Sequence, residues 1–317
     1  MHYLITGASG FIGRTLCQRL VEQGHEVSAV SRSGTDVAVA QNILVNDLLD
    51  AGRLALCMQG VDVVVHLAAR AHVHGDDEAV DAVAEFRRAN VTLTETVATC
   101  ARDAGVKRVV LISSIGVNGN ATSGSPFTES DLPCPVENYT RSKLEAEGVL
   151  RRVLNNSRTV YVVLRPPLVY GPGCKGSFLK LLQLVKAAPI LPFGTFRKLR
   201  SFIYVENLVD AIMLASTTQS VEGRVLLVSD GEDISLAQLM RELARAMGRS
   251  ERVIVGFPSS WLIMLARLVG KQHLLDKMTG ELQVDSSQFV RLTGWIPRYS
   301  LEQGLQITAE WYCARHT

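Results

Sequence analysis

The chain has 317 residues, with 33 Lys or Arg against 31 Asp or Glu, so its formal net charge is only +2. Hydrophobic residues make up 47% and charged residues 20% of the sequence, a composition typical of folded globular proteins rather than disordered chains. The balanced charge argues against a nucleic-acid-binding protein, and the length allows one large domain or two.

The sequence gives little indication of export, membrane insertion or metal binding. No basic region precedes an apolar stretch at the N-terminus, which argues against a signal peptide. The longest apolar stretch, Trp261–Gly270, contains Arg267 and is far shorter than the roughly 20 residues of a membrane span. The cysteines form no CxxC pair, and His72 and His74 have no further ligand at suitable spacing, so we expect no metal site. We therefore predict a cytoplasmic protein.

The first half of the chain alternates short β-branched segments with amphipathic segments of helical length. Val61–Val65 and Val109–Ile112 are almost wholly apolar, as in strands buried on both faces of a parallel sheet. This alternation predicts right-handed βαβ units in a Rossmann-type α/β fold with a doubly wound parallel sheet. The expected strands are His2–Ile5, Glu26–Val30, Ile43–Val45, Val61–Leu67, Arg108–Ser113 and Thr159–Arg165, and the expected helices are Phe11–Gln23, Ala79–Ala104 and Asn138–Leu154.

The regular alternation of strand-like and helix-like segments ends after Arg165. There, Pro166-Pro167 and Gly171-Pro172-Gly173 interrupt regular structure. We therefore predict a first domain over residues 1–170 and a smaller α+β domain over residues 171–317. Residues near 201–218 are expected to return to the first domain. The expected elements of the second half are helices at Phe178–Ala188, Glu206–Ser216, Ser235–Ala246 and Leu301–Tyr312, and an extended segment at Val225–Val228.

Three glycines, Gly7, Gly10 and Gly13, lie between the first expected strand and the first expected helix. In this position the first permits a tight turn, the second lets the backbone approach a pyrophosphate, and the third allows close packing of helix on strand. The helix that begins at Phe11 and Ile12 would present unpaired N–H groups to the phosphates. The motif predicts that the first domain binds a dinucleotide.

The second expected strand ends in Ser31, Arg32 and Ser33, where an NAD site has an Asp or Glu that accepts from the ribose 2′-hydroxyl. A hydroxyl and a guanidinium would instead bind a 2′-phosphate, and Arg14 would add a second cation. We therefore predict NADP(H) in preference to NAD(H); the alternative is a solvated Arg32 and a site that accepts either cofactor. Further residues expected beside the cofactor are Asp47, Leu48, Leu67, Ala68 and Ala69.

Candidate catalytic residues follow at a strand end and on a helix. Ser114 closes the fifth expected strand, at the edge where open α/β sheets bind ligands. Tyr139 and Lys143 are four residues apart and share one helix face. The Lys143 ammonium would lower the pKa of the Tyr139 phenol toward the range of a general acid/base and could hold the nicotinamide ribose. Ser114 would hydrogen-bond the substrate oxygen that gains or loses this proton. A Tyr–Lys pair alone is often an ordinary surface pair, but here it follows a dinucleotide motif and a strand-end serine.

These motifs together resemble the NAD-dependent epimerase/dehydratase family of extended short-chain dehydrogenases/reductases, which acts on nucleotide sugars. The resemblance implies that Ser114, Tyr139 and Lys143 are catalytic and that residues 171–317 bind a nucleoside-diphosphate sugar. The matching segments are Thr6–Gly13, His66–Ala69, Asn90, Leu111–Gly119, Tyr139–Lys143, Leu164–Gly173 and Arg200–Asp210.

The resemblance also implies further contacts with the two ligands. Asn90 and Pro166 would lie beside the cofactor, together with Tyr139 and Lys143. Arg200 matches the arginine that binds the diphosphate of the sugar nucleotide, and a guanidinium suits this role because it binds phosphate oxygens bidentately. Ser177 and Phe193 lie in segments that resemble the loops around the nucleotide base.

The residues after Ser114 bear on the reaction. Nucleotide-sugar 4,6-dehydratases of the family need an acid pair there, whereas Ile115 and Gly116 cannot transfer a proton. We therefore expect hydride transfer at C4 of a UDP- or dTDP-sugar. The predicted NADPH favours reduction of a 4-keto-6-deoxy sugar nucleotide for surface polysaccharides; the alternative is a UDP-glucose or UDP-GlcNAc type 4-epimerase with tightly bound NAD. A non-catalytic dinucleotide sensor is disfavoured because Tyr139 and Lys143 are both present.

The family often forms twofold dimers through the helix that carries the tyrosine and the helix before it, so the resemblance implies a homodimer. Apolar residues of these two helices could serve either such an interface or the core of one protomer. These residues are Val91, Leu93, Val97, Leu144, Val149 and Leu150.

Overall fold

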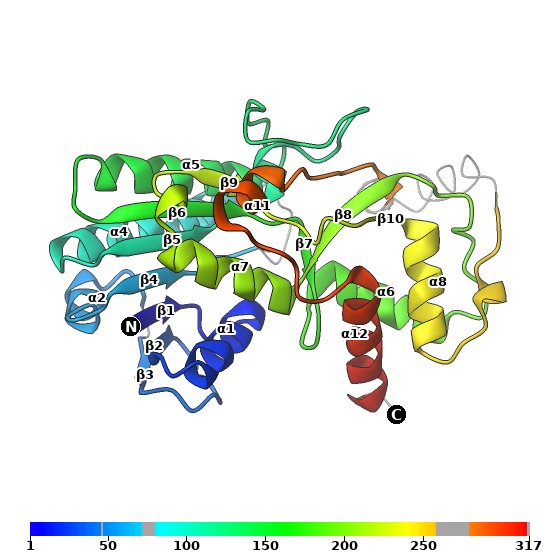
Figure 1. Cartoon of the computed structure of the whole chain (residues 1–317), viewed down its shortest axis with the longest axis horizontal. Helices are drawn as coiled ribbons and strands as arrows, with labels where there is room; N and C mark the ends of the chain where they lie inside the picture. The colour runs from blue at the N-terminus through cyan, green and yellow to red at the C-terminus, as the bar shows by residue number, and fades with distance from the viewer. Residues whose placement is uncertain (46, 72–79, 258–278, 316–317) are drawn as a thin grey trace.

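The structure is a computed structural model of the chain that describes residues 1–45, 47–71, 80–257 and 279–315 (Figure 1). The two histidines His72 and His74 and the apolar stretch Trp261–Gly270 lie outside these residues. Within the described part of the chain, no helix is long and apolar enough to cross a bilayer.

A seven-stranded sheet organises the first lobe, with strand order β3-β2-β1-β4-β5-β6-β9 and every neighbouring pair parallel. The chain winds in opposite directions from β1, toward β3 on one side and toward β9 on the other. The carboxyl ends of β1 and β4 therefore flank the switch point at which such sheets bind ligands. The strands are β1 His2–Thr6, β2 Glu26–Ser31, β3 Gln41–Leu44, β4 Val63–His66, β5 Arg108–Ile112, β6 Val160–Arg165 and β9 Val225–Leu227.

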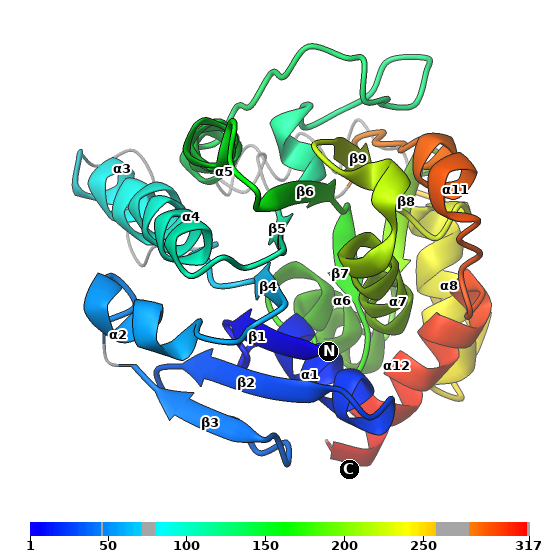
Figure 2. The ribbon, with the colours of Figure 1, turned by 60° about the vertical axis from the view of Figure 1, so that its left-hand side comes forward.

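Alternate residues of each strand enter two separate cores, because successive side chains of a strand point to opposite faces. Tyr3 and Ile5 of β1 belong to the core under α1 and α7, whereas Leu4 belongs to the core under the other helices. Figure 2 shows α1 and α7 on one side of the sheet and α2, α4 and α5 on the other. The doubly wound fold is confirmed. These helices are α1 Phe11–Glu22, α7 Val205–Thr217, α2 Ala51–Cys57, α4 Leu93–Asp103 and α5 Asn138–Leu154.

The helix expected over Ala79–Ala104 is present from Val80 to Asp103, but it is not α-helical throughout. The structure has α3 at Val80–Phe86, a π-helical segment at Arg87–Thr92, and then α4. The wider turn contains Asn90, which is buried and bonds to side chains and backbone outside its own helix. Hydrophobic periodicity cannot reveal such a turn, because it is stabilised by contacts distant in sequence. Turns of this kind often occur at functional sites.

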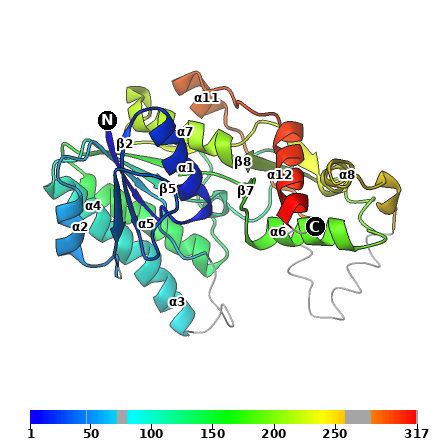
Figure 3. The same cartoon turned by 90° about the horizontal axis from the view of Figure 1, so that it is seen from below.

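Within the described residues, a three-stranded sheet of order β10-β8-β7 and the helices α6, α8 and α12 form the second lobe, on the right of Figure 1. Its core contains the aromatic rings of Tyr170, Phe178, Phe202 and Tyr204. Figure 3 shows α12 near α8, with which it packs. The elements are β7 Leu168–Tyr170, β8 Leu199–Tyr204, β10 Asp233–Ser235, α6 Gly176–Ala187, α8 Leu236–Ala246 and α12 Leu301–Arg315.

The chain passes between the lobes more than once. Of the segment expected to return to the first domain, α7 packs against α1 while most of β8 remains in the second lobe. Asp230, which follows β9, accepts hydrogen bonds from the Tyr204 amide, the Asn207 amide group and the Tyr170 hydroxyl. Burial raises the pKa of this carboxyl to about 7. Asp230 thus ties the end of a first-lobe strand to β7 and β8.

Most of the apolar residues considered for a dimer interface belong to the protomer core. All of them are buried except Leu144, which is half-buried. Two ion pairs cross the outer surface between the helices, Arg87 with Glu145 (3.1 Å) and Arg152 with Glu95 (3.0 Å). The homodimer therefore stays a prediction.

Candidate active site

The glycine loop joins β1 to α1 at the carboxyl edge of the sheet. Gly7 has a positive φ of 75°, and a Cβ atom there would lie 2.8 Å from the amide nitrogen of Ala68. At Gly13 a Cβ would lie 2.3 Å from the carbonyl oxygen of Gly7, so neither position accepts a side chain without a shift of backbone. Gly10 is the N-cap of α1 and has no capping side chain. This bare cradle at a helix N-terminus fits the pyrophosphate of a dinucleotide.

The ribose end of the cradle is formed by β2 and the residues after it. Ser31 is buried, and within the described residues its hydroxyl has no hydrogen-bond partner. Arg32 is exposed, and the Ser33 hydroxyl donates to that of Ser9 in the glycine loop (3.3 Å). Serines and a guanidinium therefore lie where an NAD site has a carboxylate.

One acidic residue near this edge was not predicted. Asp36 forms an ion pair with Arg14, with 3.3 Å between Oδ2 and Nη1. Arg14 also donates from Nε to the carbonyl oxygen of Ser9 (3.1 Å). Both side chains are exposed, so the pair is weak and the guanidinium can exchange partners.

The other residues expected at the cofactor fall into two groups. Ala68 lies against the glycine loop, and its amide donates to the Thr6 hydroxyl (3.3 Å); Leu67 and Ala69 flank it in the chain. Asp47 pairs instead with Arg88 at the start of the π-helical segment (3.1 Å). Leu48 packs against the core under α2 and α4.

Ser114 follows β5 and is the N-cap of a short 3-10 helix, η2, at Ile115–Val117. Its Oγ accepts a hydrogen bond from the amide of Gly116 (3.2 Å). A Cβ on Gly116 would lie 2.6 Å from Cγ2 of Thr140, so this turn packs directly on the first turn of α5. The fold thus brings the turn that Ser114 caps against Thr140, the residue that follows Tyr139.

The first turn of α5 is held in place from both sides. A capping box between Glu137 and Thr140 fixes its N-terminus. The Ser142 hydroxyl donates to the carbonyl oxygen of Tyr139 (2.7 Å) and accepts from Nδ2 of Asn90 (2.8 Å). The Asn90 amide also bonds to the backbone of Arg70 through both its oxygen and its nitrogen. Both the oxygen and the nitrogen of the Asn90 side chain therefore form hydrogen bonds within the protein, and through Ser142 these bonds position Tyr139.

The ionisation of the Tyr–Lys pair differs from the expectation. Burial raises the pKa of Tyr139 to about 12, with a smaller contribution from the Glu137 carboxylate. Burial also lowers the pKa of Lys143 to about 8, although the Glu147 carboxylate opposes this change. The expected net fall in the Tyr139 pKa is wrong for this structure, because the cost of removing the phenolate from water outweighs the attraction of nearby positive charge.

Arg200 lies on β8 in the second lobe and is half-buried. Its Nη1 donates to the carbonyl oxygen of Gly280 (2.6 Å), and burial lowers the pKa of the guanidinium. Among the ion pairs of the described residues, none includes Arg200. A partly desolvated guanidinium in this state is suited to bind an anion.

The remaining expected ligand residues divide between the lobes. Pro166 lies beside the Ser114 turn, since its carbonyl oxygen accepts the amide of Ile115 (2.9 Å). Ser177 is in the first turn of α6. The ring of Phe193 lies 5.9 Å from that of Phe196 and packs on the second-lobe core.

A connection beside the site, formed by residues 281–285, was not predicted from the sequence. The amide of Phe127 donates to the carbonyl oxygen of Gln283 (2.8 Å), and the amide of Ser201 in β8 donates to that of Leu282 (2.8 Å). Segment 281–285 thus joins the loop after Ser114 to the second lobe. Isolated bridges of this kind leave no periodic pattern in a sequence.

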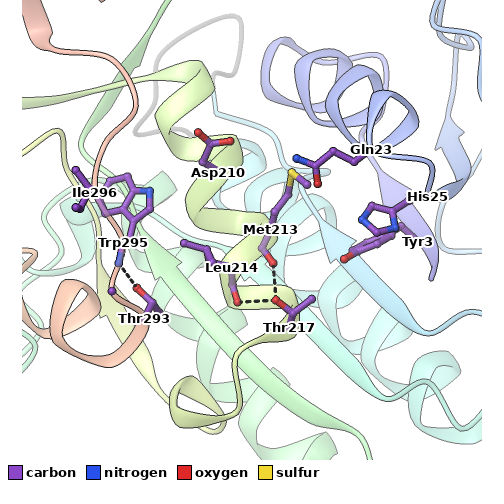
Figure 4. A pocket seen from close by; sticks show the side chains of 11 residues that line it. Tyr3, Gln23, His25, Asp210, Met213, Leu214, Thr217, Thr293, Trp295 and Ile296 are labelled. Carbon is purple, nitrogen blue, oxygen red and sulfur yellow. Dashed lines mark hydrogen bonds between the residues drawn. The ribbon is translucent and has the colours of Figure 1, made fainter.

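A cavity of about 440 Å³ lies at the opposite end of β1 from the glycine loop (Figure 4). Tyr3, Met213 and Trp295 line it, and Asp210 contributes a carboxyl whose pKa is raised by burial. Because Tyr3 lies at the amino end of its strand, this cavity is separate from the candidate active site.

Comparisons with known proteins agree with this geometry. The model of the NAD dependent epimerase/dehydratase family matches residues 3–229. A UDP-glucose 4-epimerase of Vibrio cholerae is 37% identical over 310 residues, which cover 97% of this chain and 94% of the relative. A 2-alkyl-3-oxoalkanoate reductase of Stenotrophomonas maltophilia is 28% identical over 335 residues, covering 96% of this chain and 98% of the relative.

Solved structures are similar over the full length. MoeE5 in complex with UDP-glucuronic acid and NAD superposes with a TM-score of 0.80 at 26% sequence identity and covers 100% of both chains. The fold, the glycine cradle and the family match lead to one assignment. The chain belongs to the NAD-dependent epimerase/dehydratase family and has a Rossmann-like fold.

Proposed function

We propose that this protein catalyses oxidation and reduction at C4 of a UDP-sugar, and that the net reaction is 4-epimerisation. The observation that carries the proposal is the packing of the Ser114 turn against the first turn of α5, which contains Tyr139, at the sheet edge where the glycine cradle lies. The 37% identity to a UDP-glucose 4-epimerase supports epimerisation in preference to the reduction that the sequence alone favoured.

The chain's own residues account for the proton transfers. Tyr139 removes the proton of the C4 hydroxyl and later returns it, while Ser114 donates a hydrogen bond to the same oxygen. A nicotinamide cofactor bound in the glycine cradle would take up and return the C4 hydride. Lys143 lies one helical turn from Tyr139, so its ammonium stabilises the phenolate. Ile115 and Gly116 supply no acid, which disfavours elimination of water.

Arg200 is the proposed anchor for the substrate diphosphate. The guanidinium provides paired N–H donors, and phosphate oxygens would replace the water it has lost on burial. Ser177 and Phe193 are proposed to lie near the nucleotide base. The two lobes would then hold the cofactor and the sugar nucleotide on opposite sides of Tyr139.

A second reaction, NADPH-dependent reduction of a 4-keto-6-deoxy UDP-sugar, is favoured by one observation. Ser31, Arg32 and Ser33 place no carboxylate at the ribose end of the cradle, and Arg14 lies close enough to pair with Asp36 after this strand. A 2′-phosphate would find two guanidinium groups there. If it binds, Arg32→Ala should weaken NADP(H) binding roughly 10- to 100-fold, as expected for a charge-assisted hydrogen bond, and leave NAD(H) binding unchanged. Arg53→Ala, an exposed arginine on α2, is the matched control.

The two reactions are separated by one pair of assays. The purified protein is incubated with UDP-glucose or UDP-GlcNAc, with and without added NAD, and the sugars are identified by NMR. Formation of the C4 epimer without net change in nicotinamide absorbance supports the epimerase. Loss of NADPH absorbance with a UDP-4-keto-6-deoxy-HexNAc supports the reductase instead. If neither assay gives product, the proposed chemistry at C4 is wrong.

A further inference from the structure

A buried charge cluster lies next to the candidate active site. Glu147 and Arg165 are both buried and form a bidentate ion pair, with Nε donating to Oε1 (3.0 Å) and Nη2 donating to Oε2 (2.6 Å). The Ser113 hydroxyl also donates to Oε1 of Glu147 (2.5 Å). Nη1 of Arg165 donates to Oδ1 of Asn118 (2.8 Å). Three donors therefore hold the carboxylate in one orientation.

Each member of the cluster adjoins a different part of the proposed catalytic machinery. Glu147 lies one helical turn after Lys143 on α5. Ser113 precedes Ser114, and Asn118 ends the 3-10 helix that Ser114 begins. Arg165 ends β6, next to the residue whose carbonyl oxygen accepts the amide of Ile115. The cluster thus connects both the Ser114 turn and helix α5 to Arg165 at the end of β6.

Net stability is a poor explanation for this pair. Desolvation of two buried charges largely offsets their attraction, so packed apolar side chains would hold the segments together equally well. A carboxylate beside a desolvated ammonium has a different effect, because opposite charges within one helical turn favour each other's charged form. The position of Glu147 relative to Lys143 is the feature that an apolar residue could not replace.

We propose that Glu147 and Arg165 are positioning residues: the pair holds the Ser114 turn against α5, and the Glu147 carboxylate keeps the Lys143 ammonium protonated. The proposal rests on the role assigned to Lys143 in the proposed function. Tyr139 lies one turn before Lys143 on the same helix, and the Lys143 charge acts on His66 of β4. Arg165 is connected to Lys143 through its pair with Glu147. Burial keeps Tyr139 and His66 neutral near pH 7, which leaves Glu147 as the anion of this group.

The electrostatic half of the proposal is tested by Glu147→Gln. The pKa of Lys143 is measured by NMR titration of [ε-13C]lysine in the full chain, and Lys143→Met identifies the resonance. We expect the variant to lower the Lys143 pKa by about one unit, because the nearby carboxylate charge is lost. The activity of the variant should then fall at correspondingly lower pH on the alkaline side. An unchanged or raised pKa would overturn this half.

Glu145→Gln is the matched control, because Glu145 is on the same helix but is exposed and paired with Arg87. It should leave the Lys143 pKa unchanged. If Glu147→Gln alone does not fold, the double variant Glu147→Gln, Arg165→Met removes both buried charges together. It is also expected to lower the Lys143 pKa, because the carboxylate is on the same helix as Lys143; a wild-type value would overturn the proposal.

Asn118→Ala tests the positioning half. It releases the end of the Ser114 turn but leaves Glu147 charged, so kcat should fall about tenfold while the Lys143 pKa stays at its wild-type value. An unchanged kcat would overturn this half. The NMR titration needs neither substrate nor cofactor, so its outcome is independent of the proposed function. An enzyme without C4 activity refutes that function, whereas an active enzyme with an unaltered Lys143 pKa in Glu147→Gln refutes only the present proposal.

Discussion

Nε2 of His66 donates a hydrogen bond to Oγ1 of Thr94, across 3.1 Å. This direction follows because Thr94 gives its only hydroxyl proton to the carbonyl oxygen of Asn90 (2.6 Å). Burial lowers the pKa of His66 to about 3, so the imidazole is neutral near pH 7 and carries its one proton on Nε2. Nδ1 then accepts from the Thr6 hydroxyl (2.7 Å), whose oxygen accepts in turn from the Ala68 amide, and the ring links the glycine loop to the π-helical segment.

Stability should depend on pH through this ring. Burial lowers the pKa of His66 from its usual 6.5 to about 3, so the unfolded chain binds a proton between these values that the folded chain does not. The free energy of unfolding is therefore reduced as pH falls below about 6.5, by at most about 1.4 kcal/mol per pH unit, and the loss is complete near pH 3. Urea unfolding at pH 7, 6 and 5 measures this slope.

The comparison with His66→Gln isolates the contribution of the ring. Asp230 acts in the opposite sense, because its raised pKa favours the folded state at lower pH, and the difference between the two proteins removes its effect. The variant should be less stable at pH 7 but should lose less stability between pH 6.5 and 5. Equal slopes for the two proteins would show that His66 does not titrate in this window.

Tyr139→Phe removes the proposed acid/base and retains the ring that packs near Phe86. The turnover number should fall on the order of 10²–10⁴-fold, because proton transfer to and from the C4 oxygen loses its catalyst. Dissociation constants for the cofactor and for UDP-sugar, measured by calorimetry, should change little. Tyr161→Phe removes a hydroxyl from a half-buried tyrosine on β6 and should leave activity intact. Similar activities for the two variants would exclude Tyr139 as the acid/base.

The sheet and helix α5 were predictable because their signals are local. Strands buried on both faces leave continuous apolar runs such as that at β5, and α5 has the bounds Asn138–Leu154 that its sequence predicts. The π-helical segment was not predictable, because Asn90 bonds to partners 20 and 52 residues away in the chain. The three-residue strands β7 and β10 are too short for any periodicity to appear.

The sequence predicts which residues form the candidate site, but it does not predict the direction in which their pKa values shift. The spacing of Tyr139 and Lys143 shows that their charges can interact, but it does not show how far the fold removes them from water. Burial then reverses the expected direction of the tyrosine pKa. The Glu147–Arg165 pair was not predictable for the same reason, since nothing local distinguishes the buried Glu147 from the exposed Glu145 on the same helix.

Arg200→Ala should weaken binding of the sugar nucleotide without affecting the cofactor. Loss of a charge-assisted hydrogen bond to phosphate is expected to raise KM roughly 10- to 100-fold, which corresponds to about 1.5–3 kcal/mol. Binding of UDP alone, measured by calorimetry, should weaken by a similar factor. Lys198→Ala removes an exposed cation two residues away and is the control. If both variants bind UDP like the wild type, the diphosphate lies elsewhere.

Gly13→Ala should damage the dinucleotide site directly. The added methyl group would lie 2.3 Å from the carbonyl oxygen of Gly7 and 2.8 Å from Cα of Ala8, and backbone atoms cannot move aside as a flexible side chain can. Overpacking of this kind reduces stability by about 1–3 kcal/mol, and the displaced loop should lose affinity for NAD(H) and NADP(H) alike.

Gly148→Ala is the control for Gly13→Ala, because it should raise the stability of the protein instead of lowering it. Among the described residues, a Cβ at this exposed position of α5 would lie in open space beside its own helix, and alanine is favoured over glycine in a helix by about 0.5–1 kcal/mol. This variant should therefore be slightly more stable than the wild type in urea and should bind the cofactor normally. If Gly13→Ala were as stable in urea as Gly148→Ala and bound the cofactor equally well, the close packing of α1 on the glycine loop would not determine the shape of the cofactor site.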